Sequence, residues 1–333
     1  MFRYFVCVLG VLGFVSAAHA APKYYEGKTM EFVISNGVGG GFDLYGRTFA
    51  KYYSKYLPGN PKIIVKNVQG FAGASGIRYT LARNVTDGTH VNLVQPSQFL
   101  WSAVGAAPYV DTRKIRFIGS LTRDVWIVVA DRTKVRSWED LMLHHIGVTD
   151  ARSDGAITAR LLRHILKKNY KLVAGYKKNP DILLAIERGE VTSATGHTYS
   201  TTSNKRPYWF DPKSKFGAVL VESTFNSAKT SELPMITSLA KDPDTLDLIK
   251  FVQGRYDIGR PVWAVPGTPD HIMKMLRDAF DKTVQDPMYK RDMKKRKLQS
   301  APASAKELDA VVAKMYSTKK SIVETATSIV TGK

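Results

Sequence analysis

The chain has 333 residues, with 49 Lys and Arg against 29 Asp and Glu, so its formal net charge is +20 at pH 7. Hydrophobic residues make up 44% of the chain, which excludes intrinsic disorder, because a disordered chain combines high net charge with low hydrophobicity. The single cysteine excludes a disulfide-stapled small domain and a thiolate metal site, since both need several cysteines.

The first twenty residues have the pattern of a secretory signal peptide. Arg3 supplies the positive start, residues 4–15 are mostly apolar, and Ala18-His19-Ala20 is a small-x-small cleavage site. The apolar stretch falls short of the ~20 residues that span a bilayer, although an uncleaved anchor or a buried helix would have a similar pattern. We expect cleavage after Ala20 and export to the periplasm. The mature chain then lacks the only cysteine, Cys7, and its charge without Arg3 is +19.

Short apolar runs alternate with amphipathic segments along the rest of the chain. A strand is expected at 30–35, a helix at 42–57, a strand at 62–67 and a helix that follows the loop 70–76. Further strands are expected at 90–94, 117–121, 125–130, 146–148, 171–174, 191–194, 216–221 and 262–265, and further helices at 154–168, at 180–188 and over most of the last seventy residues. This alternation, in a chain roughly twice the length of a typical domain, predicts two α/β domains with largely parallel sheets.

Glycines crowd the loop 36–43, between the first strand and the first helix. Glycine lets backbone N–H groups approach a ligand closely, and the N-terminus of the following helix favours an anion. A dinucleotide fingerprint requires a third glycine where Phe42 stands, and a P-loop requires a lysine where Arg47 stands. A nucleotide site is therefore not expected. An anion loop and a simple tight turn, with Asp43 as a helix-start residue, both fit the pattern.

A second glycine-rich loop, 70–76, has the same place after the next strand. Loops of consecutive β-loop-α units lie side by side at one edge of a sheet, so the two loops predict a shared anion cradle. The loops 149–156 and 196–200 also follow strands. They could form the facing wall of a cleft, and each is equally typical of an ordinary capped turn.

Signs of catalysis or of nucleic-acid binding are weak. The chain has neither a GxSxG elbow nor an HExxH motif, and the neighbours His144 and His145 point in different directions, so they make a poor pair of metal ligands. We expect no enzyme activity, no metal and no cofactor. The basic run at 290–297 lacks the context of a nucleic-acid-binding motif. In an exported protein we interpret it as a solvated face.

At these residues the sequence resembles the substrate-binding receptors of tripartite tricarboxylate transporters, also called Bug receptors. The resemblance covers nearly all of the mature chain, and the order and spacing of its motifs carry it more than any single motif. The first loop lacks a proline that is common in the family, and the second loop carries Phe71 and is a residue or two longer. The matching segments are 30–35, 39–43, 58–61, 67–76, 87–89, 118–121, 187–191, 259–261, 264–269 and 286–287.

The resemblance implies a two-lobed, type II periplasmic-binding-protein-like fold. Lobe one would comprise residues 21–121 plus 222–333 and lobe two residues 122–221, with two strands crossing near 121 and 221 as a hinge. It also implies a monomeric receptor that binds a small carboxylate in the cleft, closes on it and hands it to a membrane permease. Recognition in this family relies on backbone amides and waters more than on salt bridges.

The resemblance also implies ligand-binding positions in both lobes. Arg123 would pair with a carboxylate, or it would be a surface residue of the hinge. The other implied positions are Asn36, Gly37, Gly39, Gly40, Asp43, Gly73, Ala74, Ser75, Gln95 and Ser97 in lobe one and Ser153, Asp154, His197 and Ser200 in lobe two. Two further readings remain open: an orphan receptor that acts as a sensor or partner-binding module, and a hydrolase that uses the same cleft.

Overall fold

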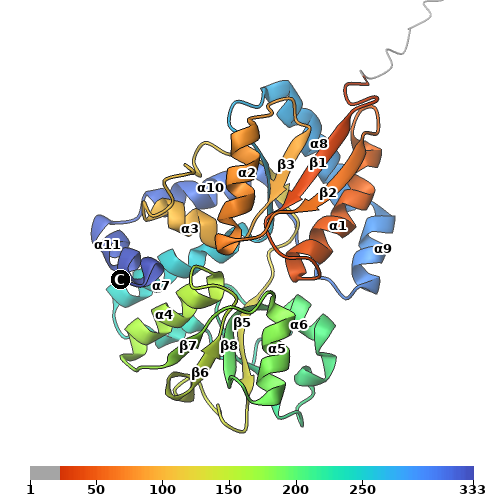
Figure 1. Cartoon of the computed structure of the whole chain (residues 1–333). Coiled ribbons are helices and arrows are strands. Elements are labelled where there is room, and N and C mark those ends of the chain that lie inside the picture. The colour runs from red at the N-terminus through yellow and green to blue at the C-terminus, as the bar shows by residue number, and fades with distance from the viewer. Residues whose placement is uncertain (1–22) are drawn as a thin grey trace, which may run out of the picture.

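The computed structural model describes residues 23–333, so the expected signal peptide and Cys7 lie outside the described residues. Two β-sheets, each flanked by helices, form the two halves of the molecule (Figure 1). The chain crosses from the first sheet to the second between Ser120 and Trp126, and it returns between Val221 and Pro261.

The first sheet has six strands in the order β11-β4-β10-β3-β1-β2. Its strands form where the apolar runs predict them: in β1 the side chains of Met30, Phe32, Val33 and Ile34 are all buried. The strands are β1 (Thr29–Ile34), β2 (Lys62–Asn67), β3 (His90–Leu93), β4 (Arg116–Ser120), β10 (Pro261–Ala264) and β11 (Ala303–Ser304).

The second sheet has five strands in the order β7-β6-β8-β5-β9. Its central members are buried along their whole length, as expected for a sheet covered by helices on both faces. The strands are β5 (Trp126–Asp131), β6 (His145–Gly147), β7 (Lys171–Val173), β8 (Ser193–Thr198) and β9 (Phe216–Val221).

Both sheets are mixed, so the prediction of largely parallel sheets was wrong. β1 runs parallel to β2 and β3, and β6 runs parallel to β7 and β8. In contrast, β10 is antiparallel to β3 and β4, and β5 is antiparallel to β8 and β9. β5 and β10 are the first strands of each sheet after the chain has passed between the halves, so neither is joined to a neighbour in its own sheet by a βαβ crossover.

Three helices have no counterpart in the sequence prediction: α3 (Ser97–Ala103), α6 (Tyr199–Lys205) and α7 (Pro243–Gln253). α6 is rich in Ser and Thr, which have poor helix propensity, so tertiary packing decides its structure. The other helices are α1 (Gly41–Tyr53), α2 (Ala74–Arg83), α4 (Asp154–Leu166), α5 (Asn179–Arg188), α8 (Asp270–Gln285), α9 (Pro287–Lys295), α10 (Ala305–Tyr316) and α11 (Lys320–Thr331).

One apolar cluster extends across both halves. It joins Phe99 and Leu100 of α3 to Ile157 and Leu161 of α4, and it includes residues of α7, α10 and α11. The buried guanidinium of Arg160 in α4 donates to two carbonyls at the end of α11, so the C-terminal helix lies against the half that holds the second sheet (Figure 1). The exact lobe boundaries stay a prediction.

Candidate functional site

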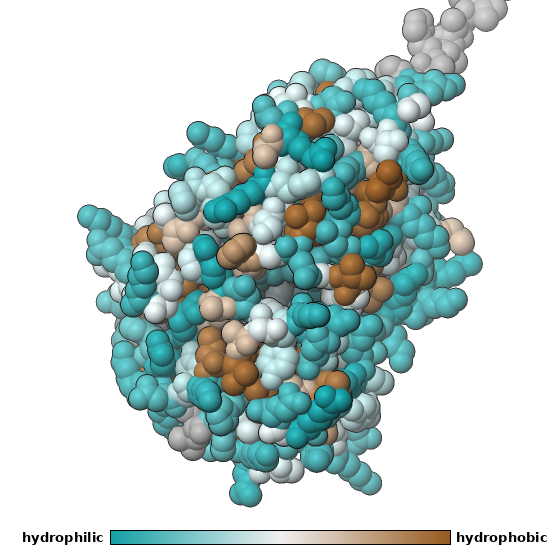
Figure 2. All heavy atoms as spheres, in the orientation of Figure 1, coloured by the Kyte–Doolittle hydropathy of each residue, from teal (hydrophilic) through white to brown (hydrophobic). Residues whose placement is uncertain are grey.

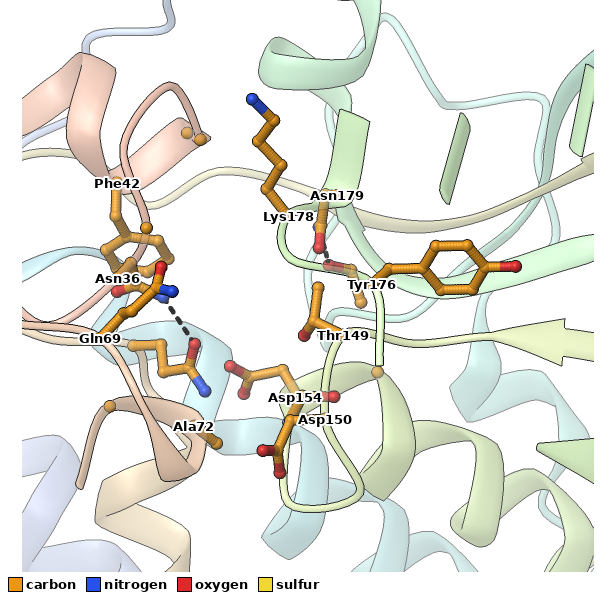
Figure 3. A pocket seen from close by; sticks show the side chains of 18 of the residues that line it. Asn36, Phe42, Gln69, Ala72, Thr149, Asp150, Asp154, Tyr176, Lys178 and Asn179 are labelled. Atoms are coloured by element: carbon orange, nitrogen blue, oxygen red, sulfur yellow. Dashed lines mark hydrogen bonds between the residues drawn. The ribbon is translucent and has the colours of Figure 1, made fainter. Parts of the chain in front are cut away.

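A cavity of about 270 Å³ lies between the two halves. One wall consists of loops that follow β1, β2 and β3, and the other of loops that follow β6, β7 and β8. Figure 2 shows the face of the molecule where the two halves meet, and in Figure 3 the side chains of Asn36, Phe42 and Gln69 face those of Thr149, Asp154 and Lys178. The volume lies just below the ~300–1,000 Å³ of drug-sized ligand sites, so the cavity suits a small metabolite.

Five helices begin at this cavity. The residue before the first turn lines the cavity in each of α1, α2, α4, α5 and α6. These residues are Gly40, Gly73, Ser153, Lys178 and Thr198. In α1, α2 and α5 no side chain of the N-cap residue accepts a hydrogen bond from the first turn. Because the N-terminus of a helix carries free N–H groups and partial positive charge, the cavity is built to receive an anion.

The first loop is held in shape by Asp43. Its carboxylate accepts hydrogen bonds from the N–H of Gly39 at 2.9 Å, from Nδ2 of Asn67 at 2.9 Å and from Nε of Arg47 at 2.8 Å. The side chain of Asp43 therefore stabilises the conformation of the loop and does not line the cavity. Asn36 does line it and donates from Nδ2 to Oε1 of Gln95 at 2.8 Å (Figure 3).

The second loop has an unusual backbone. Gly70, Phe71, Ala72 and Gly73 all have positive φ, at 134°, 46°, 51° and 94°. Two of these residues carry a Cβ atom, which costs of order 1–3 kcal/mol each in this region and persists only when surrounding contacts hold it. Gln98 of α3 is one such contact, because its Nε2 donates to the carbonyl of Ala72 at 2.6 Å. The ring of Phe71 lines the cavity and is 64% exposed.

On the opposite wall, Ser153 and Asp154 begin α4. The hydroxyl of Ser153 accepts from the N–H of Ala156 at 3.3 Å, which is an N-cap bond. The carboxylate of Asp154 lines the cavity and accepts from Nε of Arg255 at 2.9 Å. Burial raises the pKa of Asp154, and the charge of Arg255 opposes that shift.

Residues 196–200, predicted as a loop, belong to the end of β8 and the start of α6. Behind this wall, Glu222 supports β8 at Gly196. Its Oε1 accepts from the N–H of Gly196 at 2.8 Å, and its Oε2 accepts from the hydroxyl of Tyr256 at 2.9 Å. Burial raises the pKa of Glu222 to about 8, so this carboxyl is mostly protonated at neutral pH. Burial lowers the pKa of the neighbouring His197 to about 3, so its imidazole is neutral.

Seven of the fifteen predicted site residues line the cavity: Asn36, Gly37, Gly40, Gly73, Gln95, Ser153 and Asp154. The other eight are not among the lining residues: Gly39, Asp43, Ala74, Ser75, Ser97, Arg123, His197 and Ser200. Three of these have clear partners elsewhere. Arg123 pairs with Glu307 at 3.3 Å, Ser97 accepts from Gln95 at 3.0 Å, and Ser200 donates to the buried carboxylate of Asp124.

Sequence reasoning missed one whole loop of the cavity. Residues 175–179 follow β7 and carry Tyr176, Lys177, Lys178 and Asn179 to the wall (Figure 3). The rule that selected the other loops, a loop between a predicted strand and a predicted helix, would have selected this one too. The remaining lining residues outside the predicted set are Ser35, Gly41, Phe42, Gln69, Gly70, Phe71, Ala72, Trp126, Thr149, Asp150, Gly155, Thr195, Gly196, Thr198, Thr201 and Arg260.

Residues 23–333 hold neither a group of metal ligands nor a helix that could span a membrane. In this part of the chain, no three His, Cys, Asp or Glu side chains are grouped as metal ligands. Within the same residues, no helix combines the length and the apolar character that crossing a bilayer requires.

No protein-family model and no curated protein sequence matches this chain. Solved structures do. A TctC solute binding protein from Polaromonas is 17% identical with a TM-score of 0.63, and the match covers 92% of this chain and 98% of that one. MatC from Rhodopseudomonas palustris with bound malate is 14% identical with a TM-score of 0.68, covering 89% and 99%. An R. palustris protein with adipate is 16% identical with a TM-score of 0.67, covering 90% and 97%.

These matches confirm the predicted fold. Nearly the whole of each solved chain is covered, so the likeness extends over both halves and is not limited to one sheet. The chain therefore has the two-lobed α/β fold of tricarboxylate-type periplasmic binding proteins, as the sequence resemblance predicted.

Proposed function

We propose that this protein is a periplasmic solute-binding receptor that captures a small organic acid in the cavity between its lobes and delivers it to a tripartite tricarboxylate-type permease. The convergence of five helix N-termini on one cavity carries this proposal. Each terminus contributes roughly half a positive charge and a set of oriented N–H donors. A carboxylate matches that arrangement in charge and in hydrogen bonding.

The charged side chains of the walls support the same conclusion. Asp154 is paired with Arg255 behind it, and Arg260 lies 3.8 Å from the buried Asp124, so each of these charges has a counter-charge. Lys177 and Lys178 form no salt bridge within residues 23–333, and neither does Asp150, so two positive charges against one negative charge remain on the wall after the two pairs cancel. The bound malate and adipate of the two R. palustris proteins are acids of a size that suits such a cavity.

A thermal-shift panel tests the proposal. Malate, adipate, citrate, glutamate and benzoate would be compared with neutral glucose and glycerol. A ligand at a hundredfold excess over its Kd adds about 2.7 kcal/mol to the free energy of unfolding, so a binding acid raises Tm clearly. A rise with neutral sugars and with no acid would contradict the proposal.

Export, delivery and the lack of turnover need tests of their own. N-terminal sequencing of the periplasmic protein should begin at Ala21, and deletion of the gene should reduce uptake of the bound acid. Mass spectrometry of the ligand that co-purifies should recover the acid unaltered, because a receptor does not convert its cargo. Recovery of a hydrolysis product would favour the hydrolase hypothesis instead.

A further inference from the structure

Arg260 lies at the deep end of the cavity, between the two lobes. It directly precedes β10 of the first sheet, and its side chain reaches Thr198 and Thr201 at the start of α6 in the other lobe. Its side chain is only 3% exposed, yet it lines the cavity. The rings of Phe42 and Tyr45 lie 4.6 and 4.3 Å from the guanidinium carbon and fix the plane of the group.

The hydrogen bonds of this guanidinium are incomplete. Nη2 donates to the hydroxyls of Thr198 and Thr201 at 3.3 and 3.4 Å, which are long for such bonds. Nε is buried and has no hydrogen-bond partner within residues 23–333. Asp124 supplies charge at 3.8 Å, but its carboxylate oxygens accept from the hydroxyl and the N–H of Ser200.

Arg255, a buried arginine with a structural role in the same protein, provides a comparison for the hydrogen bonds of Arg260. Its Nε bonds to Asp154 at 2.9 Å, and its Nη2 donates to Thr158 at 2.9 Å and to Tyr256 at 2.8 Å. Its Nη1 donates to the carbonyl of Val252 and to Gln253. A guanidinium carries five N–H donors, and leaving a buried charged donor unpaired is costly. Arg260 therefore lacks partners that Arg255 has.

The Nη1 and Nη2 end of Arg260 meets the N-terminus of α1. A Cβ atom placed on Gly41, the first residue of α1, would lie 3.4 Å from both Nη1 and Nη2 of Arg260. The free N–H groups of a helix start and a guanidinium thus adjoin at one point of the cavity. Both kinds of group bind carboxylate, and a guanidinium binds it through two parallel N–H···O bonds.

We infer that Arg260 binds the carboxylate of the ligand and thereby selects the acid over a neutral analogue. This inference rests on the proposed function. It adds a direct ion pair between Arg260 and the ligand to the recognition by backbone amides and waters. The bound carboxylate accepts hydrogen bonds from Nη1 and Nη2 of Arg260 next to the start of α1. Thr198 and Thr201 hold the guanidinium in place from the other lobe.

The test compares an acid with its own amide. From the panel of malate, adipate, citrate, glutamate and benzoate, the acid that binds the wild-type protein most tightly is titrated by calorimetry against wild type and R260Q, alongside its amide. We expect R260Q to weaken the acid at least tenfold and the amide less than threefold, so that the preference for the acid falls. R116Q removes the same charge from the edge of the first sheet, outside the cavity, and should change neither affinity.

Each other outcome has a definite meaning. Equal weakening of acid and amide in R260Q would assign Arg260 a structural role and overturn the inference, while the proposed function would stand. If no acid binds wild type, the proposed function fails and the inference fails with it. If R260Q does not fold, a crystal structure of wild type with the acid decides: carboxylate oxygens about 2.7–3.2 Å from the guanidinium nitrogens support the inference, and a carboxylate bound elsewhere overturns it.

Discussion

Arg255 donates from Nε to Oδ1 of Asp154 across 2.9 Å, and this pair is buried in the wall between the cavity and α7. Replacing Arg255 by Met would leave a buried carboxylate without its partner. Breaking a buried pair in this way costs about 3–5 kcal/mol. We therefore expect R255M to lower the free energy of unfolding by about that amount in urea denaturation.

R113M is the matched control for this substitution. Arg113 pairs with Asp111 at 2.9 Å on the surface, where solvent screens the interaction. Its removal should leave the urea midpoint unchanged. A loss in R255M no larger than that in R113M would show that the buried pair does not stabilise the fold.

The buried carboxyl of Glu222 makes stability depend on pH. Its pKa is raised to about 8 in the folded protein, whereas an exposed Glu titrates near ~4.3. The folded state therefore holds a proton that the unfolded state has lost, and stability falls as pH rises from about 4.5 to about 8. The nearby Asp154 also has a raised pKa and adds to the same slope, while His197 is neutral in both states above about pH 6.5.

The E222Q variant isolates the contribution of Glu222 to the pH dependence of stability. Gln retains an oxygen for the N–H of Gly196 and an amide for the hydroxyl of Tyr256, and it does not titrate. Urea unfolding between pH 6.5 and 8 should show wild type losing about 1–2 kcal/mol more than E222Q, since one pH unit corresponds to about 1.4 kcal/mol per proton. Parallel pH profiles would show that Glu222 is ionised in the folded protein at neutral pH.

Predictions from sequence succeeded where one local rule was sufficient. Hydrophobic runs located β2 at 62–67 and β9 at 216–221 to the residue, and glycine loops after strands located two of the three loops of the first wall. The sites that were missed depend on contacts between distant segments. Arg260 and Trp126 reach the cavity from the strands that cross between lobes, and no local pattern marks the direction of those strands.

Asp43, His197 and Ser200 are predicted site residues that do not line the cavity. Each residue type binds ligands in other proteins, and each stands in the first turn of a helix or at a strand end near the cavity, but its side chain is directed to an internal partner or to the core. The sequence specifies which loop a side chain belongs to. Whether that side chain points into the cavity or away from it depends on rotamers and on partners such as Gly39 and Asp124, which come together only in the fold.

Ala72 holds a left-handed conformation with φ 51°, and glycine adopts this conformation without steric cost. Removing the Cβ atom should recover about 1–2 kcal/mol of strain, while the greater freedom of glycine in the unfolded chain costs about 0.4–1 kcal/mol. We expect A72G to raise the free energy of unfolding by about 0.5–1 kcal/mol on these terms. Two residues later, Ala74 begins α2 with ordinary helical angles. A74G should therefore lower stability, and a loss of stability in both variants would argue against strain at Ala72.

The start of α1 lies close to the other lobe at Gly41. A Cβ atom there would lie 2.7 Å from Oγ1 of Thr201 in α6, so either the Thr201 side chain or the two helices must shift. Over-packing of this kind costs about 1–3 kcal/mol, and about 1.4 kcal/mol is a tenfold change in affinity. G41A should therefore weaken binding of the acid about tenfold.

The double variant G41A/T201A separates this steric effect from the loss of a ligand contact. Ala at position 201 removes the Oγ1 atom that the new Cβ would meet, so the double variant should bind more tightly than the two single losses would give if they were additive. Calorimetric titration of wild type, both single variants and the double variant gives that coupling energy directly. Additive losses would mean that the lobes do not approach each other at Gly41 when the acid is bound.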